Sequence, residues 1–296
     1  MRVPIRLGAG LVLAAALAGC GTGTAPYTPD PLATAAPPGP PAGSRAEAAA
    51  LAGQLLSRLD LPPGASRLPP EPLSASLREP ASGCECPTTY IDVHQVFAGP
   101  QPVASVVTAL EARAPAGMAV AGYGGGGGLQ EVDYTVHQVP AGIAGAQVEL
   151  TVAAGPSGGS LLRADAQVTW YPPRTFAEYI DPAYYHALTI AVTVYGREVH
   201  TVHAVVTSQA VIARLAEALD QSQAQPPGGI VVCPAISAIY QLAFSVWGNH
   251  RPAVMVSGNQ LSCGGTGITV AGKTQPALDD QGTVAVIVDQ VLHLTP

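Results

Sequence analysis

The sequence alternates between apolar and polar side chains over nine residues, Leu162-Arg163-Ala164-Asp165-Ala166-Gln167-Val168-Thr169-Trp170. Successive side chains of a β-strand point to opposite faces of the sheet, so this alternation predicts one strand with an apolar face and a polar face. We expect Leu162, Ala164, Ala166, Val168 and Trp170 to face a hydrophobic core. The other set of side chains is expected to face water.

The same reasoning extends in both directions along the chain. Further strands are predicted within residues 88–97, 131–136, 147–153, 188–194, 199–206, 236–247, 253–256 and 268–271. Helical spacing of apolar residues predicts helices within 44–59, 103–113, 208–219 and 284–291, the first of them opened by a Ser44-to-Glu47 capping box. Neighbouring strands with helices set apart predict an α+β fold with a mostly antiparallel sheet and several packing helices.

The distribution of proline, glycine and glutamine suggests where the chain divides. A Gln-rich stretch ending in Pro226-Pro227-Gly228-Gly229 separates a body at 44–225 from a C-terminal βββα lobe at 226–296. The ordered part can form one large domain or two lobes, and this break favours two. The five glycines at 124–128 predict a flexible surface loop.

The N-terminus has the three parts of a secretory signal peptide at residues 1–19. Arg2 and Arg6 precede an apolar run of about a dozen residues, which is too short to span a bilayer. The ending Leu17-Ala18-Gly19-Cys20 resembles the bacterial lipobox, in which the cysteine is acylated and becomes the first residue after cleavage. Residues 20–43 are rich in Pro, Gly and Thr and predict a flexible tether. We therefore expect a lipoprotein that membrane lipid holds, through Cys20, on the extracytoplasmic face of the cell membrane.

Charge and composition exclude one class of partner. Only 11% of the residues are charged, where ordinary domains have about 25%, and the net charge is −7. Nucleic-acid binding requires a basic face, and the 13 Lys and Arg residues are scattered. A nucleic-acid partner is therefore not expected.

Four cysteines follow Cys20, and in an exported protein an even number favours disulfides. Cys233 and Cys263 fall in the same predicted lobe and form the preferred pair. Cys84 and Cys86 are two residues apart, where a bridge is strained. They remain open to three interpretations, namely a structural disulfide, a redox-active pair, or a soft-metal site with His94 nearby.

Three motifs match known patterns in the wrong context. The segment from Gly267 to Thr274 has P-loop spacing, but its centre reads as a strand, so no nucleotide is expected. Gly155-Pro156-Ser157-Gly158-Gly159 has the spacing of a nucleophile elbow but lies between two strands, as a hairpin loop does. Glu131 and Asp133 share a strand face, as two glycosidase carboxylates would, but a solvated polar face is the simpler explanation for them. No catalytic residue, cofactor or metal ligand is assigned.

The body is similar to a group of secreted proteins and lipoproteins of unknown function from high-GC Gram-positive bacteria. The residues that carry this resemblance lie in the segments 59–65 and 162–172 and in the terminal unit from Cys233 to Cys263. It brings no catalytic residues and supports the Cys233–Cys263 pairing, whereas Cys84-Glu85-Cys86 departs from it. The leading hypothesis is a non-enzymatic binding or structural protein of the cell envelope. The alternatives are an exported hydrolase and redox or metal handling at Cys84 and Cys86.

Overall fold

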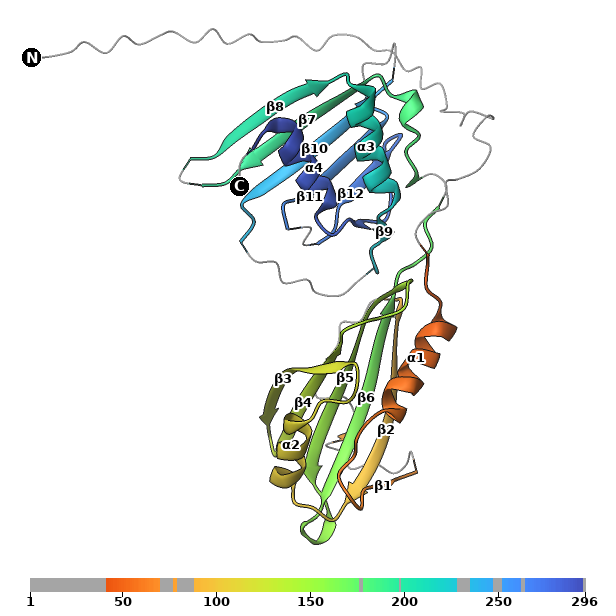
Figure 1. Cartoon of the computed structure of the whole chain (residues 1–296), viewed down its shortest axis with the longest axis vertical. Helices are drawn as coiled ribbons and strands as arrows, with labels where there is room; N and C mark the ends of the chain where they lie inside the picture. Colours follow the sequence, from red (N-terminus) through yellow and green to blue (C-terminus); the bar gives the residue numbers. More distant parts are fainter. Residues whose placement is uncertain are drawn as a thin grey trace, which may run out of the picture. The chain divides into compact units, whose positions relative to one another are not determined.

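The computed structural model describes residues 41–69, 77–78, 88–175, 178–196, 198–227, 235–246, 252–261 and 264–294. Within them the chain forms two six-stranded antiparallel sheets and four α-helices (Figure 1). The predicted α+β class with mostly antiparallel pairing is confirmed. No helix in these described ranges is long and apolar enough to cross a membrane.

The first sheet has its longest strands in the middle. Its order is β1 (Ser66–Arg67), β2 (Tyr90–Gly99), β6 (Ser160–Trp170), β5 (Ile143–Ala154), β4 (Leu129–Val136) and β3 (Met118–Gly126). The predicted apolar side chains of 162–170 all lie in its core, as the alternation indicated. Two helices, α1 (Arg45–Ser57) and α2 (Val103–Ala112), cover this core on one face (Figure 1).

Both helices have identifiable anchors. At the start of α1, Ser44 Oγ accepts a hydrogen bond from the backbone N–H of Glu47 at 3.2 Å, so the N-cap half of the predicted capping box is confirmed. The Glu47 carboxylate folds back onto the Ser44 hydroxyl, which donates to Oε2 at 2.8 Å. At the end of α2, the buried Tyr134 hydroxyl donates to the Leu110 carbonyl at 2.7 Å. The two helices are thus held on one face of the sheet, and they do not cover its other face.

The second sheet has its own core. Its order is β13 (Lys273–Thr274), β12 (Gly267–Val270), β11 (Val254–Asn259), β10 (Ala238–Ser245), β7 (Ala187–Val194) and β8 (His200–Val206). The helices α3 (Gln209–Asp220) and α4 (Thr283–Leu292) supply the rest of this core. A small two-stranded sheet joins β9 (Gln223–Ala224) to β14 (Leu278–Asp279).

The strand pairing differs from the predicted division at residue 226. Strand β7 pairs with β10 over its whole length, from Ala187 with Ser245 to Val194 with Ala238, so the predicted boundary cuts through one sheet. The two cores divide between Trp170 and Ile180. The Pro-rich and Gln-rich stretch was misleading because it contains β9 and connects elements of one sheet and its helices. Composition alone does not show which strands a connection joins.

The two rejected motifs and the glycine run at 124–128 can each be compared with the structure. The centre of the P-loop match is strand β12, and Ser157 lies in a short 3-10 turn (Pro156–Gly158) between β5 and β6, both as expected. The prediction of a loop at 124–128 was wrong for its first three glycines, because they pair with β4 as the end of β3. A Cβ at Gly125 would lie 2.7 Å from the Leu129 carbonyl oxygen, so the close approach of the two strands requires glycine there.

Candidate functional site

The face of the first sheet that points away from α1 and α2 carries three rows of side chains in register across four strands. We call these twelve residues the polar face. In the order β2, β6, β5, β4, the rows are Asp92, Gln167, Gln147 and Thr135; His94, Asp165, Glu149 and Asp133; and Val96, Arg163, Thr151 and Glu131. Five of the twelve are carboxylic acids and only one is a guanidinium.

The centre of the polar face is buried, which corrects the prediction of a wet face. Asp165 is 0% exposed, and Glu149 and Arg163 are each 2% exposed. The chain at Leu77 covers this region, since Leu77 is fully buried and its carbonyl accepts a hydrogen bond from Arg163 Nη1 at 3.0 Å. The sequence between 65 and 87 reads as irregular, and nothing in it indicates that it returns to the sheet.

Arg163 and Asp165 form a two-pronged ion pair within the polar face. Because they are two residues apart on β6, their side chains point to the same side. Arg163 donates from Nε to Asp165 Oδ2 at 2.8 Å and from Nη2 to Asp165 Oδ1 at 2.6 Å. This geometry uses both carboxylate oxygens and is among the stronger arrangements available to a side-chain pair. It neutralises one of the five acids.

The remaining acids perturb one another. Asp165, Glu149 and Asp133 are directly opposite along one row, an arrangement that is unfavourable when all three are charged. Burial is the main cause that raises the pKa of Asp92 to about 6, and the negative charge of Asp165 is the second. Burial and the neighbouring Glu149 also raise the pKa values of Glu131 and Asp133. The polar face therefore balances part of its negative charge with the Arg163–Asp165 ion pair, and burial shifts the pKa values of Asp92, Glu131 and Asp133 upward.

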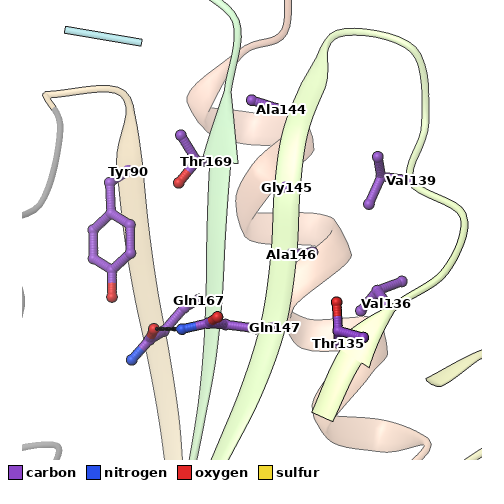
Figure 2. Close-up of a pocket in the computed structure, with 10 residues that line it drawn as sticks. All are labelled: Tyr90, Thr135, Val136, Val139, Ala144, Gly145, Ala146, Gln147, Gln167 and Thr169. Carbon is purple, nitrogen blue, oxygen red and sulfur yellow. Dashed lines mark hydrogen bonds between the residues drawn. The ribbon is translucent and has the colours of Figure 1, made fainter. Parts of the chain in front are cut away.

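A pocket of about 480 Å³ opens beside this acidic region (Figure 2). Its lining residues are Tyr90, Thr135, Val136, Val139, Ala144, Gly145, Ala146, Gln147, Gln167 and Thr169. Gln147 Nε2 donates to Gln167 Oε1 at 2.6 Å, and Gln167 Nε2 reaches Glu149 Oε2 at 3.4 Å. The two amides thus join the pocket to the acidic row. None of the lining side chains is a carboxylic acid or a base.

The pocket is equipped to bind by hydrogen bonding. Amide groups at Gln147 and Gln167 can each donate and accept, and the hydroxyls of Thr135, Thr169 and Tyr90 add further donors and acceptors. Burial, and next the charge of Asp92, raise the pKa of Tyr90, so its hydroxyl keeps its proton. The Tyr90 ring and the small apolar residues supply contact surface. Placed polar groups together with apolar contact surface in one concavity are typical of a small-molecule site.

None of the predicted site residues is among the described residues that line the pocket. Cys20, Cys84, Cys86, Cys233 and Cys263 lie outside the described residues, so the lipidation, the disulfides and the soft-metal or redox site stay predictions. His94 is exposed and lies opposite Asp165 on the polar face. Among the residues that the structure describes, no group of three or more His, Cys, Asp and Glu side chains is arranged to hold a metal ion.

Sequence reasoning missed the pocket although it named part of its lining. Gln147 and Gln167 both fell on predicted strands, but their meeting depends on the register of β5 against β6. The register shift between Ile143 and Gly145 is also not visible in the sequence pattern. No protein-family model, no curated protein and no solved structure matches the chain. The functional interpretation therefore rests on the geometry of the polar face and its pocket.

Proposed function

We propose that this chain is an exported, lipid-anchored protein of the bacterial cell envelope that binds an uncharged, hydroxyl-rich ligand of the carbohydrate class. The pocket beside the polar face carries the binding part of this proposal. It offers two amides, three hydroxyls and an aromatic ring, and no charged side chain, within about 480 Å³. No lining group is a nucleophile paired with a base, which favours binding over catalysis.

The charge around the pocket argues for a neutral ligand. Glu149 accepts from the amide of Gln167, and Asp92 lies opposite Gln167 on the neighbouring strand. An anionic ligand would meet these carboxylates, and the lining itself has no charged side chain that would pair with an ion of either sign. Hydroxyl groups, in contrast, can pair with each amide and hydroxyl in either sense. A neutral oligosaccharide meets all these conditions.

The anchor part of the proposal rests on the N-terminal sequence. The lipobox-like ending at Cys20 and the tether at 20–43 would place the folded body a short distance from the membrane. Two or more acyl chains hold a protein stably where one alone does not. A tethered binding protein of this kind keeps its ligand at the cell surface without needing a membrane-spanning helix.

Filling the pocket is the direct test of binding. Gly145 lines it, and a Cβ built there meets no atom within 4 Å, so Gly145→Phe places a ring in the open space. We expect isothermal titration with a panel of neutral oligosaccharides to give binding to the native chain. The same titration with Gly145→Phe should give binding at least about tenfold weaker, because the ring occupies the ligand's volume.

A matched substitution controls for the added ring. Gly126, on β3, also has no atom within 4 Å of a built Cβ and does not line the pocket, so Gly126→Phe should bind like the native chain. Thermal unfolding of both variants checks that they fold. Equal binding by Gly145→Phe and the native chain, or binding only of acidic oligosaccharides, would contradict the proposal.

Replacing the proposed lipid-bearing residue tests the anchor. Cys20→Ser removes the thiol that acylation requires, so the chain should move from the membrane fraction and lose the mass of its acyl groups. Membrane fractionation followed by mass spectrometry of the N-terminal peptide measures both. A native chain that carries no lipid at Cys20 would rule out the anchor while leaving ligand binding open.

A further inference from the structure

The four edges of the two sheets are protected unequally. Three carry features that hinder the addition of a further strand. The two-residue β1 leaves the outer side of β2 from Tyr90 to Gln95 without a paired strand among the described residues, and Asp92 lies on that part of the edge. Strands β1 and β13 have two residues each and carry Arg67 and Lys273, and β3 has a register shift between Val120 and Gly122 followed by glycines. Short edges, charged edge residues and bulges are the usual protections of β-sheets.

The fourth edge, β8, has none of these features. It runs for seven residues, His200-Thr201-Val202-His203-Ala204-Val205-Val206, with no proline, lysine, arginine or acid. Its pairing with β7 is regular throughout, from Leu188 opposite Val206 to Val194 opposite His200. Among the described residues no strand pairs with its outer side. A long, regular and uncharged edge is a template for strand addition.

Exposed apolar side chains lie near both ends of the same edge strand. Val205 is 69% exposed, Val199 just before the strand is 64% exposed, and Tyr195 at the hairpin turn is 43% exposed. These three are among nine large hydrophobic residues that the described part of the chain leaves exposed. Val205 lies on the face of the sheet away from α3 and α4. Its neighbours there on β8 and β7 are Thr189, Ala191, Thr193, Thr201 and His203, so no acid or base of fixed charge accompanies it.

We propose that β8 is a homodimer interface, in which it pairs antiparallel with β8 of a second copy of this chain about a two-fold axis at His203. This register pairs all seven residues. It places Thr201 opposite Val205 of the partner subunit and Val202 opposite Ala204 of the partner subunit. The two sheets then form one continuous sheet, and no like-charged pair of Lys, Arg, Asp or Glu arises at the junction.

The chemistry of the edges favours a second copy over an unrelated strand. A two-fold interface uses the same patch on both subunits and closes on itself. Once both β8 edges are paired, the outer strands of the joined sheet are the two copies of β13, which are short and carry Lys273. Association therefore stops at two copies. The uncharged strand also offers no charge pattern by which a different charged partner would be selected.

Two double variants test the register directly. Thr201→Lys with Val205→Lys puts lysine opposite lysine in both symmetric pairs, whereas Thr201→Glu with Val205→Lys puts glutamate opposite lysine. Both positions are exposed, so both double variants should fold. Sedimentation of the full chain in one detergent should show a native dimer. We expect at least about tenfold weaker dimerisation for the Lys/Lys variant than for the Glu/Lys variant.

Cross-linking in membranes supplies a second readout of the same register. His203→Cys places two thiols face to face across the axis, so oxidation should give a covalent dimer. Thr189→Cys, on β7 and the same sheet face, is one strand in from the edge and should not cross-link. A monomeric native chain, equal dimerisation of the two double variants, or equal cross-linking at 189 and 203 would each overturn the proposal.

Discussion

Replacement of Arg163 by methionine is expected to lower the free energy of unfolding by about 3–5 kcal/mol, the usual cost of removing one partner from a buried ion pair. The side chains of Arg163 and Asp165 are 3% and 0% exposed, and the guanidinium also binds the Leu77 carbonyl. Without it, the Asp165 carboxyl loses this partner while it stays buried opposite Glu149. Urea or guanidinium denaturation near pH 7.5 measures the loss.

A surface arginine provides the matched control. Arg113 pairs with Asp60 at 3.3 Å, and their side chains are 80% and 56% exposed, so Arg113→Met should cost less than about 1 kcal/mol. An Arg163→Met variant as stable as Arg113→Met would show that the polar face does not depend on its one guanidinium.

The second large effect is an unusual dependence of stability on pH. Burial is the main cause that raises the pKa of Asp92 to about 6, and burial likewise raises the pKa of Asp220 to about 6. Both start from an ordinary value of 3.8, so the folded chain binds more protons than the unfolded chain between these limits. Their stabilisation is full below about pH 3.8 and is lost as the pH rises through 6.

We expect these two groups to lower the free energy of unfolding by about 2–4 kcal/mol in total between pH 4.5 and 7.5, after allowance for solvent screening. In the double variant Asp92→Asn with Asp220→Asn neither side chain titrates. Its free energy of unfolding should therefore change less between pH 4.5 and 7.5 than that of the native chain. It keeps the Asp220 oxygen that accepts from the Ile180 N–H. A native profile that rises over this range, with no change in the double variant, would refute the assignment.

The sequence predicted the strand at 162–170 correctly and the environment of its polar side wrongly. Alternation shows that Arg163, Asp165 and Gln167 share a face, because it reflects only the local geometry of a strand. It does not show that Leu77, some 86 residues away along the chain, covers that face. Which segment covers a polar face depends on contacts between residues far apart in the sequence, and a local pattern does not show them.

The same distinction separates the other outcomes. The helix N-cap at Ser44 and the strand at 268–270 are local features, and both are present as predicted. The sheet shared by β7 and β10, and the pocket formed where Gln147 meets Gln167, depend on pairing between distant segments. The proposed binding site therefore follows from the register of the strands, whereas the proposed membrane anchor follows from the N-terminal sequence alone.

The most direct test of ligand binding observes the pocket amides themselves. In a ¹H–¹⁵N spectrum of the folded chain, the side-chain NH₂ signals of Gln147 and Gln167 can be assigned from the variants Gln147→Glu and Gln167→Glu. Addition of the neutral oligosaccharide that binds most tightly should shift these two signals, while Gln241, on β10 of the second sheet, should not respond. If no neutral oligosaccharide shifts either pocket amide, or if the shifts occur only elsewhere, the proposed binding site is wrong.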